Sequence, residues 1–227
     1  MDIDIIQGPG NAAAQVTLAN GETLVAEGGA MIAMSSDISI KTTTHQKSKG
    51  GIMSGLKRML GGESFFLNHF TANSEGAVIT VAPTLSGDMQ TLEINSNRLI
   101  VQSGSYVACE ESVEMDIGWQ GFKSLFAKEG LFWINLSGQG KVLVNSFGAI
   151  YPIHVNGEYI VDTGHIVAFD ETLKFSLSKA GKSWLSSILG GEGLVCRFKG
   201  AGTVWCQSHN ASAFGRSLGK KLKPIKQ

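Results

Sequence analysis

KSWLSSILGGEGLVC, residues 182–196, is the stretch that decides how the chain is organised, because its pattern occurs three times. Related stretches are GFKSLFAKEGLFW at 121–133 and GLKRMLGGESFF at 55–66. In all three copies a short amphipathic segment leads into an apolar run, and a glycine turn and a second apolar run follow. We therefore interpret the chain as a threefold internal repeat before considering any other feature.

Six single-residue markers support the repeat, because they keep the same order in every copy. The markers are Gly21, Asn97 and Gly157; Val25, Val101 and Val161; Gly29, Gly104 and Gly164; Ala33, Ala108 and Ala168; Glu63, Glu129 and Glu192; and Gly76, Gly140 and Gly202. Successive copies of the third and fourth markers are separated by 75 and then 60 residues. We expect the three marker valines to occupy equivalent buried positions.

The apolar runs predict an all-β protein. They are rich in aromatic and β-branched residues, which fit a packed, pleated surface. The chain has 29 glycines but only 4 prolines, a composition typical of many tight turns. We interpret residues 1–227 as a single domain of three homologous β-sandwich-like repeats with pseudo-threefold symmetry, at approximately 12–83, 90–148 and 151–208. A basic C-terminal tail follows at 211–227.

Turn signals within each unit predict β-hairpins. Asn20-Gly21 separates apolar runs at 14–18 and 23–26, and such a pair favours the positive φ angles of a hairpin turn. By the same reasoning we expect 65–70 to pair with 77–81, 131–136 with 142–146, and 194–198 with 203–207. A further hairpin is expected around Asn156-Gly157.

Short amphipathic segments between the strands are the main candidate functional feature. At 52–60, 121–127 and 182–189 the apolar residues have the spacing of one helical face. One interpretation is that these faces cap the β core, as short amphipathic segments in compact proteins usually do. The alternative is an exposed contact surface for another subunit or for a membrane. The candidate contact residues are Met53, Leu56, Met59, Phe122, Phe126, Trp184, Leu185 and Ile188.

Composition and motifs predict no cofactor, no metal and no catalytic site. The 19 basic and 19 acidic residues cancel, so net charge gives no support for nucleic-acid binding. The sequence has no Walker A loop and no G-x-G-x-x-G between a strand and a helix. None of the 5 histidines has the spacing of a zinc site. His154 and His165 lie in neighbouring predicted strands, where hydrogen-bonded structural histidines are the favoured interpretation.

The cysteines and the N-terminus favour a cytoplasmic location. Cys109, Cys196 and Cys206 form no C-x-x-C pair, and we expect them to be buried thiols in a reducing compartment. The N-terminus lacks the charged and apolar regions of a signal peptide. No apolar run reaches the roughly 18 residues that are needed to span a bilayer. A peripheral association with the membrane is compatible with these features.

EGGAMIAM at 27–34, VDTGHIVAF at 161–169 and GGEG at 190–193 are distinctive motifs. They resemble motifs of the altered-inheritance-of-mitochondria protein 24 family, whose first signature is E-x-G-A-M, although Gly28 stands where many members have proline. The resemblance covers nearly the whole chain. It implies a fold similar to that of the tryptophan RNA-binding attenuation protein, and eukaryotic relatives that sit in mitochondria and are linked to inner-membrane organisation. It implies no enzymatic activity and no catalytic residues.

These features predict a non-enzymatic scaffold or interaction protein that self-associates through β-edges and apolar tips. We therefore expect a homo-oligomer. One alternative is a peripheral membrane protein that uses the three amphipathic segments. A second is an RNA or small-ligand binder, which rests only on the analogy with ring-forming attenuation proteins. The sequence identifies no ligand, and the lack of a basic patch interleaved with aromatic residues argues against nucleic acid.

Overall fold

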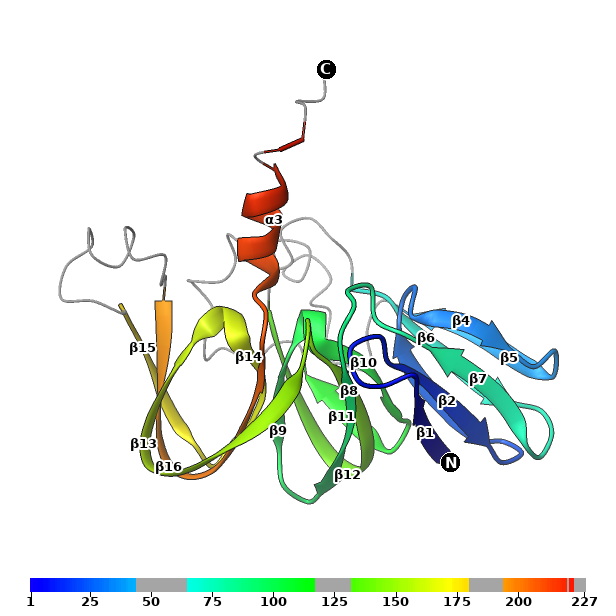
Figure 1. Ribbon diagram of the computed structural model, residues 1–227. Helices are drawn as coiled ribbons and strands as arrows, with labels where there is room; N and C mark the ends of the chain where they lie inside the picture. The colour runs from blue at the N-terminus through cyan, green and yellow to red at the C-terminus, as the bar shows by residue number, and fades with distance from the viewer. Residues whose placement is uncertain (44–64, 117–131, 180–193, 220, 223–227) are drawn as a thin grey trace.

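The computed structural model describes residues 1–43, 65–116, 132–179, 194–219 and 221–222. These residues form antiparallel β-strands and one α-helix. The strands are grouped into three β-units that lie in a row (Figure 1). The predicted all-β class is therefore confirmed.

The first unit is built from seven strands. They are β1 (Asp2–Ile6), β2 (Ala13–Leu18), β3 (Thr23–Glu27), β4 (Met31–Met34), β5 (Ile38–Thr43), β6 (Leu67–Ala72) and β7 (Ala77–Val81). Strands β1, β2, β7 and β4 form one sheet in that order, whereas β3, β6 and β5 belong to a larger sheet. Alternating burial directs Val16 of β2 and Ile79 of β7 into a core shared with Leu24 and Phe70 of the other sheet, as the two-residue period of a strand requires.

The second and third units are built around long strands. The second unit contains β8 (Met89–Asn95), β9 (Leu99–Gln102), the short 3-10 helix η1 (Ser103–Ser105), β10 (Tyr106–Glu110), β11 (Val113–Asp116) and β12 (Trp133–Asn145). The third contains β13 (Ile150–Asp162), η2 (Thr163–His165), β14 (Ile166–Asp170), β15 (Lys174–Lys179) and β16 (Leu194–Gln207). The first half of β12 pairs with β9 and β11, and its second half pairs with β8 and β10.

The predicted hairpins are wrong. β12 and β16 each continue as one strand across the glycines that the sequence predicts as turns. At Gly140 and Gly200 the φ angles are 146° and 119°, so these glycines bend a strand between layers without ending it. β13 likewise continues through Gly157. In the first unit the chain does turn at Gly21 and Gly76, but β2 and β3, and likewise β6 and β7, enter different sheets.

Two antiparallel strand pairs connect neighbouring units, and we call these pairs joints. In the first joint β3 pairs with β10, and Ala26 lies opposite Ala108. In the second joint β9 pairs with β14, and Val101 lies opposite Ala168. All four side chains are fully buried. Each joint therefore extends a sheet from one unit into the next.

The joints correct one predicted equivalence between units. Ala26, not Val25, occupies in the first joint the place that Val101 occupies in the second. The predicted equivalence of the marker valines is therefore wrong for Val25. The reason is a one-residue difference at the preceding turn, where the left-handed residue is Gly21 (φ 82°) in the first unit and Ser96 (φ 65°) in the second. The three valines are nevertheless all buried.

A β-bulge lies at the same motif position in each unit. The pairing register shifts at Ile32 in β4, at Val107 in β10 and at Val167 in β14. Bulges increase the local twist of a strand and change its direction. Pairing of the described strands joins the first unit to the second and the second to the third, and it contains no joint between the third and the first. The predicted pseudo-threefold symmetry stays a prediction.

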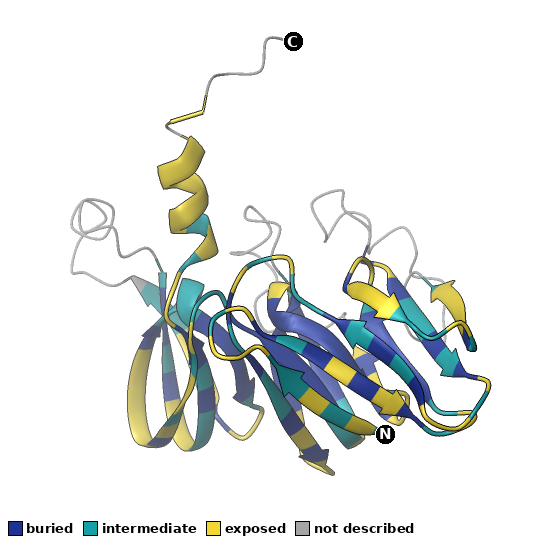
Figure 2. Cartoon of the chain, turned by 45° about the vertical axis from the view of Figure 1, so that its right-hand side comes forward, coloured by how far each residue is buried: buried dark blue, intermediate teal, exposed yellow. Residues whose placement is uncertain are grey.

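Helix α3 (Ala211–Gly219) occupies the start of the predicted basic tail. The side-chain oxygen of Asn210 accepts a hydrogen bond of 3.0 Å from the backbone N–H of Ala213, which caps the helix N-terminus. The helix has no buried residue, and it stands away from the strands (Figures 1 and 2). The helix is therefore attached to the fold mainly through its N-terminal end.

Candidate functional site

All eight candidate contact residues of the amphipathic segments lie outside the described residues. Their segments fall within 44–64, 117–131 and 180–193. A contact surface formed by these residues stays a prediction. The residues concerned are Met53, Leu56, Met59, Phe122, Phe126, Trp184, Leu185 and Ile188.

The described strands present a different candidate surface, which is formed by one strand at each end of the row. Within the described part of the chain β4 pairs only with β7, and β13 pairs only with β16. Strands β10 and β14 correspond to β4 in the second and third units, and β9 corresponds to the second half of β13. These three strands have partners on both sides. One backbone edge of β4 and one backbone edge of β13, at residues 158–162, therefore have no paired strand among the described residues. These two edges lie at opposite ends of the row (Figure 1), and we call them the β4 edge and the β13 edge.

Both edges expose large apolar side chains. On the β4 edge Met31 is 38% exposed and Ile32 is 59% exposed. On the β13 edge Tyr159 and Ile160 are each 47% exposed. Apolar side chains that adjoin unpaired backbone groups are typical of a strand that can bind a further strand.

The two edges also differ from the other edge strands in the charges that they carry. Among the described strands, five others have a single partner, namely β1, β5, β8, β11 and β15. Each of these five carries a charged residue, such as Asp2 in β1, Lys41 in β5 and Glu93 in β8. The β4 strand has none. The β13 edge carries Glu158, which pairs with Arg197 and Lys199 of β16, and Asp162, which accepts a hydrogen bond from the backbone N–H of Gly164. Charged residues on an edge strand oppose pairing with other chains, so β4 is the least protected of these strands, and on the β13 edge both carboxylates already have partners within the chain.

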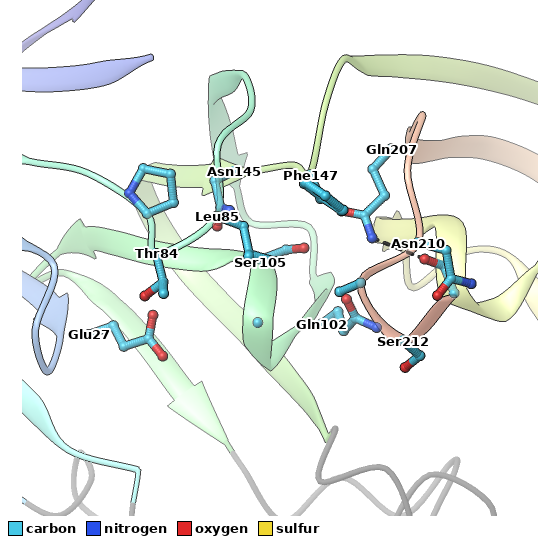
Figure 3. Close-up of a pocket in the computed structure, with 14 residues that line it drawn as sticks. Glu27, Thr84, Leu85, Gln102, Ser105, Asn145, Phe147, Gln207, Asn210 and Ser212 are labelled. Atoms are coloured by element: carbon cyan, nitrogen blue, oxygen red, sulfur yellow. Dashed lines mark hydrogen bonds between the residues drawn. The ribbon is translucent and has the colours of Figure 1, made fainter. Parts of the chain in front are cut away.

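A cavity of about 300 Å³ lies between residues of all three units, and Asn210 and Ser212 at the start of α3 contribute to its lining (Figure 3). Its lining combines apolar surface, which includes Leu85 and the ring of Phe147, with amide and hydroxyl groups and the carboxyl group of Glu27. None of the lining residues that the structure describes is basic. Burial raises the pKa of Glu27 to about 7, because the charged form loses its hydration. The cavity therefore suits a small uncharged molecule better than an anion.

Part of the polar lining is used to hold the fold together. The side-chain amide of Gln207 donates a hydrogen bond of 3.0 Å to the carbonyl of Gly164. Its oxygen accepts one of 2.8 Å from the backbone N–H of Phe147. Gln207 thus fastens the link between the second and third units to η2. Because the donor and the acceptor of the Gln207 side-chain amide both have partners within the chain, this amide is not a free ligand-binding group.

The two histidines that the sequence places near each other have separate structural partners. His154 Nδ1 lies 3.3 Å from the hydroxyl of Thr203. His165 Nδ1 lies 2.8 Å from the carbonyl oxygen of Gln207, so it donates a hydrogen bond there. The interpretation as structural histidines is therefore confirmed. Within the described residues, no group of three or more His, Cys, Asp or Glu side chains is arranged to hold a metal ion.

The three cysteines are buried free thiols, as predicted. Burial raises the pKa of Cys109, Cys196 and Cys206 to about 12 in each case. Since the thiolate is the nucleophilic form of cysteine, these side chains are poor nucleophiles in the folded protein. Cys196 and Cys206 lie in one continuous strand, β16, and not in two arms of a hairpin.

The exposed face of α3 is a further apolar feature. Phe214, Leu218 and Leu222 are exposed, and they recur every four residues, which places Phe214 and Leu218 on one side of the helix. Arg216 and Lys221 lie among them. No helix within the described residues is long and apolar enough to cross a membrane.

Comparison with known proteins agrees with the motifs. The profile of the family described as mitochondrial biogenesis AIM24 matches residues 4–209. The chain belongs to this family. The predicted family resemblance, which rests on EGGAMIAM and the related motifs, is therefore confirmed.

The relatives of this AIM24 family member are uncharacterised bacterial proteins. An uncharacterised protein of Streptococcus pyogenes serotype M6 is 28% identical over 214 residues, which covers 92% of this chain and 86% of the relative. The X-ray crystal structure of a protein from Streptococcus pyogenes superposes with a TM-score of 0.79 at 25% identity, and the match covers 97% of this chain and 99% of that one. The fold of this chain is therefore shared over its full length.

The β4 and β13 edges are absent from the sequence-based predictions, although the sequence holds a signal for them. The motif strands MIAM, YVAC and IVAF, which start at residues 31, 106 and 166, are apolar in all three copies. Only the second and third copies have a preceding unit to pair with. An apolar strand at the first copy therefore implies an unfilled place beside β4.

Proposed function

We propose that this protein is a non-enzymatic scaffold of three homologous β-units, related by pseudo-threefold symmetry, that self-associates through its β-edges. The repeat is supported by the shared β-bulge position and by the common register of the two joints. The observation that carries self-association is the pair of edges with exposed apolar side chains at opposite ends of the row.

The energetic argument favours association through several side chains together. Burying one large apolar side chain contributes about 1.5–3 kcal/mol, and association costs about 4–15 kcal/mol of lost translational and rotational freedom. Met31, Ile32, Tyr159 and Ile160 are 38–59% exposed in one chain, so each contributes about half of that amount. Together they offset part of the cost, and a new backbone ladder adds hydrogen bonds. The edges are therefore suited to reversible or stable assembly, while one isolated apolar residue would not be.

Light scattering on the purified full chain tests the proposed function. We expect a mass that is a multiple of the mass of one chain, and we expect it to fall on dilution if the assembly is reversible. A monomer at every concentration up to the solubility limit would contradict the proposed function.

A second candidate function, peripheral association with a membrane surface, is favoured by α3. Its exposed apolar side chains and neighbouring basic residues match the pattern of helices that lie in the membrane interface. We expect the chain to float with anionic vesicles and Leu218→Ser combined with Leu222→Ser to abolish flotation. The matched control is Ile40→Ser on β5, because Ile40 is about as exposed as Leu218 and β5 lies away from α3. Absence of flotation by the unmodified chain would contradict this candidate.

A further inference from the structure

We infer that copies of this protein join head to tail, with β4 of one copy paired antiparallel to the β13 edge of a second copy. Ala33 then lies opposite Val161 of the second copy, and Met34 lies opposite Ile160 of the second copy. This inference rests on the proposed self-association and names the partner, the strands and the register.

The register follows from the two joints inside the chain. The motif copies AEGGAMIAM at 26–34, VQSGSYVAC at 101–109 and VDTGHIVAF at 161–169 align without a gap. In the first joint Ala108 lies opposite Ala26, and Cys109 lies opposite Val25. In the second joint the corresponding residues are opposite each other again, Ala168 with Val101 and Phe169 with Ile100. In both joints, the eighth residue of one motif copy lies opposite the first residue of the preceding copy. The same register, continued to a further joint, pairs β4 with the β13 edge. Among the described strands, β4 has no preceding unit beside it and the β13 edge has no following unit.

The burial of corresponding residues supports the same pairing on the β4 side. Val107 is 1% exposed and Val167 is 0% exposed inside the row, whereas Ile32 at the same bulge position is 59% exposed. The residue before the bulge shows the same difference in burial, because Tyr106 is buried inside the row and Met31 at the end of the row is exposed. An apolar side chain at this position is therefore buried wherever a preceding unit is present.

The β13 side shows the matching difference. Ile100 of the second unit is 0% exposed, and Ile160 at the same motif position is 47% exposed. Leu99 is buried in the second joint, and Tyr159 at its position is exposed. Both edges thus have the side chains of a joint and lack only the neighbouring unit.

A second copy, and not the same chain, must supply that neighbour. β4 and β13 lie at opposite ends of the row in both views (Figures 1 and 2), and no pairing among the described strands connects them. The two edges are different surfaces, so pairing them between copies is heterologous, and each joined copy keeps one edge for the next. Head-to-tail joining therefore continues until a ring closes or a filament forms.

Two substitutions that block one edge each provide the test. Ile32→Lys places a charge on the β4 edge, and Ile160→Lys places one on the β13 edge, as charged residues do on protected edges. Both positions are exposed in one chain, so the melting temperature of the isolated subunit should be unchanged. We expect each variant alone to be monomeric by light scattering. An equimolar mixture should form a dimer and nothing larger, because it contains one intact edge of each kind.

The matched control is Ile40→Lys on β5, an edge strand that takes no part in a joint and whose Ile40 is 46% exposed. This variant should assemble as the unmodified chain does. Dimers of either blocked variant alone would show self-pairing of identical edges, and a monomeric mixture would show that the edges are not complementary. Either result overturns the head-to-tail inference while the proposed self-association stands. A monomeric unmodified chain contradicts both.

The register is tested by cross-linking. Directly opposed residues of antiparallel strands have Cα atoms roughly 4.5–5.5 Å apart, within the range of a disulfide. Met34→Cys in one copy and Ile160→Cys in the other should therefore form a covalent dimer under mild oxidation. The native thiols are buried and contribute little background. Tyr151→Cys, equally exposed on the first half of β13, is the control, and equal cross-linking of Met34→Cys with it would overturn the register.

Discussion

The hydroxyl group of Tyr106 donates a hydrogen bond of 2.8 Å to the backbone carbonyl of Val25, across the first joint. Both residues are fully buried. Burial raises the pKa of Tyr106 well above its usual value, so the phenol keeps its proton and remains a donor. The corresponding residue in the second joint is Ile166, which has no donor. The first joint is thus fastened by a side chain that the second lacks.

Tyr106→Phe should lower the free energy of unfolding by about 1–3 kcal/mol, because it removes a buried hydrogen bond and keeps the ring. Urea denaturation measures this loss. The control is Tyr159→Phe on the exposed β13 edge, which should change stability by less than about 0.5 kcal/mol. Equal stability of Tyr106→Phe and the unmodified chain would show that the bond contributes nothing to the joint.

Glu27→Gln should remove a loss of stability that develops as the pH rises. In the unfolded chain the carboxyl group ionises near its ordinary value of 4.5, whereas in the fold its pKa is about 7. Between these values the folded state binds more protons than the unfolded state, so the free energy of unfolding falls with increasing pH. The difference reaches roughly 3 kcal/mol above pH 7.

Thermal unfolding at pH 4 and pH 8 checks this prediction. The glutamine variant should match the unmodified chain at pH 4 and should be more stable at pH 8. Glu93→Gln on the exposed face of β8 is the control, and it should keep the pH dependence of the unmodified chain. Parallel pH profiles for Glu27→Gln and the unmodified chain would contradict the assignment.

Gly87→Ala should destabilise the link between units by at least about 3 kcal/mol. A Cβ atom at Gly87 would lie 1.7 Å from the carbonyl oxygen of Ser146 and 2.9 Å from the backbone nitrogen of Gly148. Both are backbone atoms, which cannot move without breaking the adjacent hydrogen bond of 2.9 Å from the Asp88 N–H to the Gly148 carbonyl. Chemical denaturation measures the loss. Gly215→Ala, where α3 has open space, should instead stabilise the helix slightly, and equal effects would contradict the argument.

Strand positions could be predicted from the sequence, but strand partners could not. The apolar runs at 14–18 and 77–81 become β2 and β7, and alternate residues of each strand, such as Val16 and Ile79, are buried. Alternation fixes which side chains face the core and does not fix which strand lies alongside. A glycine with positive φ serves a tight turn at Gly21 and a bend within a strand at Gly200, so the same sequence signal was compatible with both. That ambiguity accounts for the wrong hairpins.

Some features of the candidate site could be predicted from the sequence, and others could not. The repeat and the family motifs could be recognised from residue spacing alone, and the thiol and histidine environments followed from residue type. The apolar motif strands signal the joints, but the β4 and β13 edges could be located only once the pairing of the units was known, because exposure depends on which units have neighbours. Ile32 and Val107 occupy the same motif position in the sequence, yet one is exposed and the other is buried. Helix α3 was missed because Gly215 and Gly219 weaken its helical pattern, although Asn210 was a recognisable cap.

Thiol labelling should report opening of the first joint through Cys109. This thiol is buried, its pKa is raised to about 12 by burial, and its sulfur lies 3.3 Å from the hydroxyl of Tyr106. A shift from the ordinary value of 9.0 to about 12 lowers the thiolate fraction roughly a thousandfold at pH 8. A disulfide reagent should therefore leave the native chain unlabelled over minutes and modify all 3 cysteines in urea.

Tyr106→Phe should accelerate labelling of Cys109 because weakening the first joint raises the population of locally open states. Cys196 and Cys206 lie in the core of the third unit and should keep their slow rates, which makes them internal controls within the same molecule. Peptide mapping after timed labelling separates the three sites. Equal acceleration at all three would indicate global unfolding, and unchanged labelling of Cys109 would mean that the Tyr106–Val25 hydrogen bond does not hold the joint closed.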